Sequence, residues 1–228
     1  MMAPQDLRAT AALLAALAFL GCGGGPGVVQ PSPQPAAEPQ GEVAATTAAR
    51  ADSARNPYTE ADIHFMSAMI SHHAQAIVMA GWADTHDASP AVRILAGRII
   101  NAQQDEIGLM QRWLRERGLP VPEASPTGMK MKMNGVEHEM LMPGMLTPDQ
   151  MEQLNKARGA DFDWIFVTSM IQHHRGAVDM VKELFGTTGA AQDDAVFKLA
   201  SDVHVDQITE IDRMVKLLAS LPSGARSP

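Results

Sequence analysis

The sequence predicts an all-α protein, a four-helix bundle built from two helix-loop-helix repeats. Residues 62–79 align without a gap with residues 163–180, and the same Asp, Phe, Met-Ile, His-His, Ala and Met residues recur at equal spacing. A second match, between residues 103–110 and 207–214, follows each of these segments after a loop. No stretch shows the sustained two-residue alternation of a half-buried strand. Four long helices related by such a repeat most simply pack into a bundle.

The first repeat begins with a helix cap. Thr59 is followed three residues later by Asp62, which is the spacing of a capping box, and an acidic side chain also suits the first helical turn. The following stripe has spacings of four, three, four and three residues, so it occupies one helical face: Phe65, Met69, His72, Ala76 and Met79. Residues 81–90 interrupt this helix, and a second helix is expected over residues 91–117.

The second repeat is expected to form helices over about residues 161–185 and 193–221. A Met-rich connection, residues 123–146, joins the two repeats. It leads into a short helix over about residues 147–158, because Thr147-Pro148-Asp149 combines a capping residue with a proline in the first turn. The four-helix bundle domain is therefore expected to span residues 57–228.

Residues 1–22 have the features of a signal peptide. Arg8 supplies a basic residue, and residues 11–20 hold no polar side chain. That run is shorter than the roughly 20 apolar residues that span a bilayer. The following Phe19-Leu20-Gly21-Cys22 resembles a bacterial lipoprotein signal, in which the cysteine is lipidated. We therefore expect an exported protein of the periplasm or cell envelope that contacts the membrane only through a lipid anchor at Cys22; the alternative is an ordinary secretory signal.

The remaining composition excludes several classes of function. Residues 23–56 are rich in Gly, Pro, Ala, Gln and Thr, and such a segment buries too little surface to offset its ordering entropy, so we expect a disordered tether. The net charge of -8 disfavours nucleic acid as a partner. Cys22 is the only cysteine, so no intramolecular disulfide can form. No nucleophile elbow, phosphate loop or dinucleotide fingerprint occurs, and we expect that the protein is not an enzyme.

Each repeat carries two adjacent histidines, His72-His73 and His173-His174. Adjacent residues of a helix point about 100° apart, so each pair occupies two neighbouring stripes. If the first helices of both repeats face each other, the four imidazoles converge together with several thioethers. The thioethers belong to methionines at or near matching positions of the repeats: Met66, Met69, Met79, Met170 and Met180.

This set of side chains favours copper. Thioether suits Cu(I), and imidazole suits copper in either oxidation state, whereas structural zinc sites usually contain cysteine. Cu(I) is therefore favoured over Cu(II). The alternative is a structural repeat whose histidines only hydrogen-bond inside the core. Glu106 and Glu210 also recur, and they serve either as metal ligands or as hydrogen-bond partners of facing histidines.

The connection holds six methionines and one histidine between residues 129 and 145. Met129, Met131 and Met133 alternate with lysine, and His138 follows, which is poor material for a helix. Exposed methionine is easily oxidised, so an exported protein that keeps this many on a loop is expected to use their sulfur. We therefore expect Met129, Met131, Met133 and His138 to bind Cu(I). The alternative is a loop that only fills gaps over the bundle. Such a loop can also close over a neighbouring copy in a homo-oligomer. Other histidines are interpreted as ordinary ones: His64, His86 and His204.

Three motifs resemble domain-of-unknown-function family 305 (DUF305). They are Phe-x-x-x-Met-Ile-x-His-His-x-x-Ala-x-x-Met at residues 65–79 and 166–180, Gln-x-x-Glu-Ile-x-x-Met at residues 103–110 and 207–214, and Met-Pro-Gly-Met-Leu-Thr-Pro at residues 142–148. The resemblance covers about residues 57–220. It implies a ferritin-like four-helix bundle and kinship with CopM-like periplasmic copper-binding proteins, which take part in copper resistance. By this resemblance the site comprises His72, His73, His173, His174, Met69 and Met170.

Three hypotheses of function follow from the sequence. The leading one is an exported copper-binding protein that serves copper sequestration, tolerance or trafficking in the cell envelope. The second is a ferritin-like di-metal oxidase, but such sites use Glu-x-x-His, and no paired histidine follows a Glu at that spacing. The third is an anchored structural or interaction bundle that binds no metal.

Overall fold

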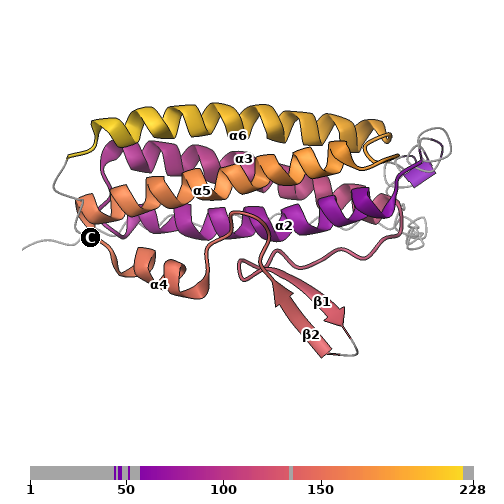
Figure 1. Ribbon diagram of the computed structural model, residues 1–228, viewed down its shortest axis with the longest axis horizontal. Helices are drawn as coiled ribbons and strands as arrows, with labels where there is room; N and C mark the ends of the chain where they lie inside the picture. Colours follow the sequence, from indigo (N-terminus) through magenta and orange to yellow (C-terminus); the bar gives the residue numbers. More distant parts are fainter. Residues whose placement is uncertain (1–43, 45, 48–50, 52–56, 134–135, 223–228) are drawn as a thin grey trace, which may run out of the picture. The chain divides into compact units, whose positions relative to one another are not determined.

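Helices dominate residues 57–133 and 136–222, which together with residues 44, 46–47 and 51 are the part of the chain that the computed structural model describes (Figure 1). All of these residues belong to one unit, Pro39–Pro228. Its elements are α2 (Glu60–Gly81), the 3-10 helix η1 (Trp82–Asp84), α3 (Pro90–Glu116), β1 (Met129–Met133), β2 (Val136–Met140), α4 (Pro148–Lys156), α5 (Gly159–Gly186) and α6 (Asp194–Ser220). The predicted all-α class is confirmed, apart from the two short strands.

Four of the α-helices, α2, α3, α4 and α6, begin where a capping side chain satisfies free backbone N–H groups of the first turn, whereas α5 begins after Arg158 without a side-chain cap. Thr59 and Asp62 form the predicted capping box of α2. The α4 helix starts at a second capping box, in which the side chains of Thr147 and Gln150 each accept a hydrogen bond from the other residue's backbone N–H. Buried Asp193 caps α6 by accepting hydrogen bonds from two backbone N–H groups. These caps explain why the observed bounds lie within about two residues of the predicted ones.

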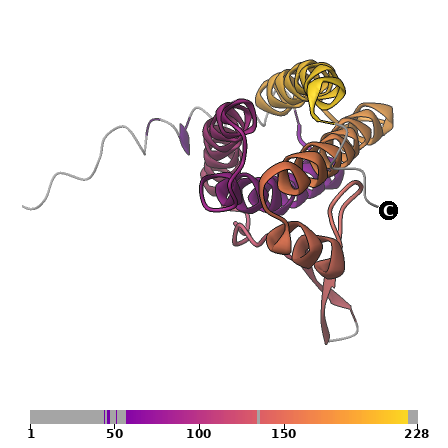
Figure 2. The ribbon, with the colours of Figure 1, turned by 90° about the vertical axis from the view of Figure 1, so that its left-hand side faces the viewer.

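Two helical hairpins, α2–α3 and α5–α6, lie side by side. The most extensive helix contacts in the described residues are those within each hairpin, followed by the contacts of α2 with α5, whereas α3 and α6 touch at few residues. Figure 2, a view turned by 90°, shows the four long helices around a shared interior. The α4 helix lies outside them and contacts α2 and α5.

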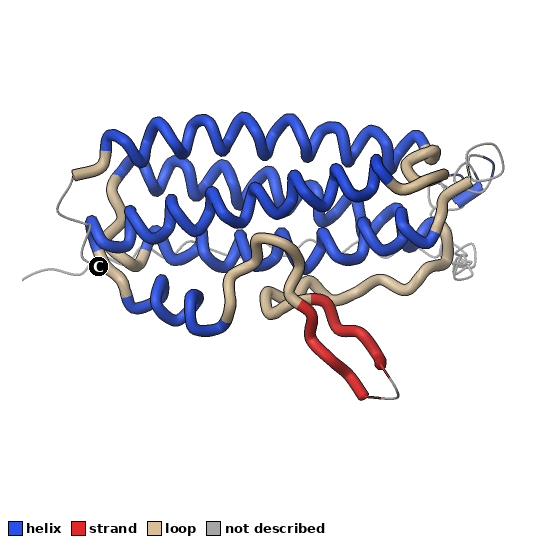
Figure 3. Tube along the Cα trace, in the orientation of Figure 1, coloured by secondary structure: helices blue, strands red, loops and turns tan. Residues whose placement is uncertain are grey.

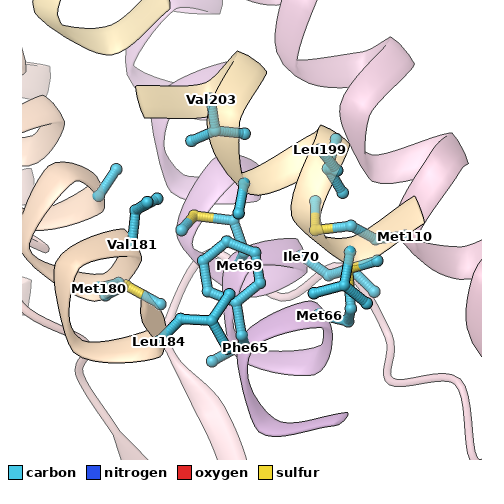
Figure 4. Packing of buried hydrophobic residues seen from close by; sticks show 14 of the residues in the cluster. Phe65, Met66, Met69, Ile70, Met110, Met180, Val181, Leu184, Leu199 and Val203 are labelled. Carbon is cyan, nitrogen blue, oxygen red and sulfur yellow. The ribbon is translucent and has the colours of Figure 1, made fainter. Parts of the chain in front are cut away.

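The apolar interior consists of two clusters of buried side chains. One cluster takes the first half of α2 and the second half of α5, from Phe65 to Ile70 and from Ala177 to Leu184 (Figure 4). The other takes the opposite halves of the same two helices. The helices α3 and α6 contribute to each cluster in the same reciprocal way. This reciprocity means that α2 and α5 run antiparallel and that the midpoints of both helices meet between the clusters.

The Met-rich connection contains a β-hairpin, so the prediction of a loop without strands is wrong for this segment (Figure 3). The strands β1 and β2 pair antiparallel, with Met129 opposite Met140 and Met131 opposite His138. The physical reason is visible in the sequence. Met and Lys alternate over residues 129–133, and Asn134-Gly135 between the strands is the dipeptide that most favours a two-residue hairpin turn.

The predicted signal peptide and its Cys22 lie outside the described residues, as does most of the predicted tether. Four tether residues are described, and all four are helical, where we expected disorder: Ala44, Thr46, Thr47 and Ala51. Alanine, the residue of highest helix propensity, is frequent in this stretch. Among the described residues, no helix combines the length and the apolar character needed to cross a membrane.

Candidate metal centre

The two histidine pairs lie between the two apolar clusters, where α2 and α5 meet. His72 and His73 follow Ile70 of one cluster, and His173 and His174 follow Ile171 of the other. All four side chains are buried. The rings of His72 and His173 lie 3.9 Å apart between centroids, and each adjacent pair is separated by 6.2 Å. The convergence expected from the repeat is therefore present, and these four residues are called the histidine layer below.

His72 is held as a neutral imidazole with one nitrogen engaged. Its Nε2 lies 3.0 Å from the carbonyl oxygen of Pro143. Because a carbonyl only accepts, Nε2–H is the donor, and the lone pair of neutral His72 resides on Nδ1. Burial, with the neighbouring His73 as a second cause, lowers the pKa of His72 to about 3. The side chain therefore carries no proton on Nδ1 at neutral pH.

Among the described residues, neither ring nitrogen of His173 has a well-aligned hydrogen-bond partner, although the backbone of His72 lies close enough to oppose the lowering of its pKa. Burial is the first cause that lowers its pKa well below the ordinary value, and the adjacent His72 is the second. His173 is thus the imidazole of the layer with the fewest competing interactions.

The outer two histidines face carboxylates on the neighbouring helices. Nε2 of His174 hydrogen-bonds to Oε2 of Glu210 at 2.6 Å. Nε2 of His73 lies 2.6 Å from Oε2 of Glu106, although without the alignment of a hydrogen bond. Of the two roles open for these glutamates, the structure shows that of partner to a histidine. A carboxylate behind an imidazole orients the ring and makes its other nitrogen a stronger metal ligand.

Negative charge accumulates on the outer side of these pairs. Partial burial raises the pKa of Asp206 first, and the charges of Glu106, Glu210 and Asp202 raise it further. Gln103 and Gln207 lie three residues before the two glutamates, and both are buried with side-chain atoms that have no hydrogen-bond partner. The polar groups of the layer thus extend from α2 and α5 to α3 and α6.

Unpartnered nitrogens make the histidine layer suited to a bound ion. Within the described part of the chain, Nδ1 of all four imidazoles lacks a hydrogen-bond partner, as does Nε2 of both His73 and His173. A buried polar atom without a partner costs roughly 1–3 kcal/mol, and native proteins keep few of them. In the described residues no group of three or more His, Cys, Asp or Glu side chains is arranged to hold a metal. A metal in the layer therefore needs donors of another kind.

The predicted methionines lie at two different distances from the layer. Met69 and Met170 precede the histidines by one helical turn, and both are fully buried. Met66 lies about one further turn away. Met79 and Met180 follow the first histidine of each pair by seven residues, about 10 Å along a helix axis, and they belong to opposite clusters. Met69 and Met170 are thus the two of these five methionines that lie nearest to the histidines along α2 and α5.

Two of the hairpin residues predicted to bind copper, Met129 and His138, do not join the histidine layer. His138 is exposed in β2, and Met129 is partly buried, packed against the first cluster. The backbone register pairs Met131 with His138 and Met133 with Val136. The side chains of Met131 and Met133 lie outside the described part of the structure, so their predicted role in copper binding stays a prediction.

Sequence reasoning missed the short loop that covers the layer, Met142–Leu146. Met142 and Met145 are buried in the first cluster. The loop sits against α5 at Gly176, where any Cβ would overlap the carbonyl oxygen of Pro143. The motif at residues 142–148 marks this loop in the sequence, but nothing in it identifies the contact with His72.

Gln75 fixes the same loop to α2. Its side-chain amide donates to the carbonyl oxygens of Pro126 and Leu146, both at 3.0 Å, and its Oε1 accepts from the backbone N–H of Leu146 at 2.7 Å. Gln75 and Gly176 occupy the same position of the two sequence repeats. One repeat thus binds the loop with a side chain, and the other leaves room for its backbone.

Several solved structures resemble this chain. One is a DUF305 protein from Streptomyces coelicolor described as a candidate secreted protein, with a TM-score of 0.58, 31% identity, and coverage of 70% of this chain and 92% of that one. Another is a DUF305 fragment from Deinococcus radiodurans, with a TM-score of 0.59, 26% identity, and coverage of 72% and 99%. A third is CopM in its Cu(I)-bound form, with a TM-score of 0.53, 28% identity, and coverage of 69% and 95%.

The sequence comparisons point to the same group. An uncharacterized protein of Acanthamoeba polyphaga mimivirus is 40% identical over 58 residues, which is 25% of this chain and 38% of that protein. Residues 62–218 match the family described as "Domain of unknown function (DUF305)". That range contains both histidine pairs, both facing glutamates and the loop that covers them. The chain belongs to the DUF305 family.

Proposed function

We propose that this protein binds copper at the histidine layer and sequesters or carries it in the cell envelope. The observation that carries the proposal is the set of buried imidazole nitrogens without partners, one helical turn from Met69 and Met170. His72, His73, His173 and His174 supply the imidazoles, and these two methionines supply the thioethers. This donor set supplements the histidines with soft sulfur ligands.

The chemistry of the layer favours Cu(I). Thioether is a soft ligand, which suits Cu(I) better than hard divalent cations. Neutral imidazoles and thioethers carry no charge, so the carboxylates of Glu106 and Glu210, which lie behind His73 and His174, supply the negative charge that offsets a buried cation. The preference for Cu(I) therefore rests on the sulfur ligands, because Cu(II) prefers harder ones.

The related structures support this choice of metal. CopM has been solved in Cu(I)-bound and Cu(II)-bound forms, at 28% and 29% identity to this chain. The same protein has also been solved with silver bound. Silver as Ag(I) is a soft monovalent ion, so these structures agree with a site built for soft metals.

The proposal extends to the fold and the location. We interpret α2, α3, α5 and α6 as a ferritin-like four-helix bundle built from two repeats, because each repeat supplies one helical hairpin. Export is supported by the signal-like residues 1–22, and a lipid anchor at Cys22 would hold the protein at the membrane. The β1–β2 hairpin, in which His138 and Met140 are exposed, is a candidate contact for a second copy.

We further propose that the protein is not an enzyme. A di-metal oxidase uses several carboxylates as direct ligands. Here Glu106 and Glu210 each face a histidine instead, so they orient imidazoles rather than carry open coordination positions. Storage or transfer of copper requires only binding and release, which the buried layer and its covering loop are suited to provide.

The test is a titration of the purified chain with Cu(I), without oxygen, against a chromogenic chelator. The decisive variant is His173→Leu, because removing an unpartnered buried imidazole in favour of a similar apolar group leaves the metal-free fold at least as stable. We expect this variant to melt at or above the parent temperature and to lose a whole equivalent of Cu(I). His204→Leu, on α6 outside the layer, is the matched control and should bind like the parent.

If the parent takes no copper from the chelator, the histidine layer has a structural role and the copper proposal is wrong. If His173→Leu binds as much Cu(I) as the parent, the metal lies elsewhere.

A further inference from the structure

A second group of soft ligands lines a small surface pocket between α2 and α5. The pocket has a volume of about 90 Å³ and opens to solvent. His64 of α2, Met180 of α5 and Met142 of the covering loop line it together, and Glu183 and Pro143 complete the part that concerns us. An imidazole and two thioethers from three separate segments thus meet in one cavity.

The two thioethers of this pocket have more access to solvent than the other predicted methionines of α2 and α5. Met142 and Met180 are each 7% exposed, whereas Met66, Met69, Met79 and Met170 are at most 1% exposed. His64 is exposed as well. A metal ion that arrives from solvent therefore meets His64 first, at the mouth of a pocket that Met142 and Met180 also line. The histidine layer offers no such access, because its four side chains are 0% exposed.

One residue, Pro143, connects the pocket with the histidine layer. Pro143 lines the pocket, and its carbonyl oxygen accepts the hydrogen bond from Nε2 of His72. The same loop, Met142–Leu146, therefore contacts both the pocket and the histidine layer. A small displacement of residues 142–144 would connect the two.

We propose that His64, Met142 and Met180 form a second metal site that takes a soft monovalent cation, Cu(I), before it reaches the histidine layer. The proposal rests on copper as the cargo of this protein but adds a separate site. Two thioethers and one imidazole form a donor set that prefers Cu(I) to harder cations. The exposed carboxylate of Glu183 raises the local concentration of cations without being a required ligand. Transfer to the layer is an exchange of ligands, and copper stays Cu(I) throughout.

The site is tested with the purified chain labelled with ¹³C in the methionine methyl groups. Cu(I) is added without oxygen at less than one equivalent, and the methyl resonances are followed by NMR. The resonances of Met142 and Met180, assigned from Met142→Leu and Met180→Leu, are expected to shift before those of Met69 and Met170. The reverse order would overturn the proposal.

Variants separate this site from the histidine layer. The triple change His64→Ala, Met142→Leu and Met180→Leu is expected to remove one equivalent of Cu(I) and to slow filling of the layer at least tenfold. Leucine conserves the volume of methionine, so the core should persist. Met110→Leu with Met214→Leu repeats the same change at two fully buried methionines outside the pocket and controls for the fold.

The outcomes for the two sites differ. If the triple variant matches the parent in both stoichiometry and rate, the pocket is not a metal site, whatever the layer does. If the triple variant loses its equivalent while His173→Leu loses none, the pocket stands and the proposed function of the layer fails.

Discussion

Replacing Gly176 by Ala tests how the covering loop is held against α5. A Cβ at this position would overlap the backbone of Pro143 and Gly144, and neither can move as a flexible side chain would. The loop must therefore shift, and this endangers the hydrogen bonds of Gln75 to Leu146 and of His72 to Pro143. The same substitution removes a glycine from a helix interior, which by itself stabilises.

The magnitudes decide the sign. Overpacking of a filled site costs about 1–3 kcal/mol, and each of the lost loop hydrogen bonds costs about 1 kcal/mol. The gain in helix propensity is about 1 kcal/mol. With an overpacking cost of about 2 kcal/mol and one of these hydrogen bonds lost, we expect Gly176→Ala to lower the free energy of unfolding by about 2 kcal/mol. Gly97→Ala on α3 is the matched control: nothing lies within 4 Å of its Cβ position, so only the gain applies.

Urea denaturation of the two variants and the parent measures this difference. We expect Gly97→Ala to be more stable than the parent and Gly176→Ala to be less stable. Limited proteolysis should also cut the connection around residues 142–146 faster in Gly176→Ala, because the loop is displaced. A Gly176→Ala variant as stable as the parent would show that the loop does not rest on α5 as described.

Three further predictions concern charged and polar groups. The pKa of His72 is about 3 in the folded chain and 6.5 in the unfolded chain, so the unfolded chain takes up the proton first and the folded state loses stability as pH falls below 6.5. Urea denaturation should therefore show about 2 kcal/mol less stability at pH 5 than at pH 7 from this group. His72→Gln should reduce this loss. Glu210→Gln should weaken Cu(I) binding ten- to a hundredfold in chelator competition, because His174 loses its carboxylate partner. Asp193→Ala should lower stability by about 3 kcal/mol in thermal denaturation, because this buried carboxylate accepts a hydrogen bond from the Trp113 indole and pairs with Arg117. Asp194→Ala, at the exposed neighbouring position, is the control and should change stability much less.

The helices could be predicted because their signals are local. The capping box of Thr59 and Asp62 and the spacing of apolar residues act within one or two turns, so the sequence alone locates the start of α2. The β-hairpin was not predicted, because its signal in the sequence is weak. Its strands have five residues each, too few for a period of two to stand out against the neighbouring loop. The Asn134-Gly135 dipeptide was the better signal.

The part of the candidate site that follows the sequence repeat could be predicted. Matching histidine pairs on two facing helices predict that His72 and His173 approach each other, and they do. The contact of His72 with Pro143 was not predictable, because 71 residues separate them and no local pattern links them. The two repeats also differ at one matching position. Gln75 hydrogen-bonds the loop with its side chain, whereas Gly176 has no side chain and so leaves room for the loop backbone.

The division of the core into two clusters has a consequence for how the chain assembles. Each cluster draws on α2 and α3 and also on α5 and α6, so neither helical hairpin encloses an apolar interior by itself. A fragment with only one hairpin would expose its apolar stripe and should stay unfolded until it meets the other fragment. Two such fragments should therefore associate and fold together. By the same geometry, an ancestor with one hairpin would have folded only as a pair of identical chains, before duplication joined them into one.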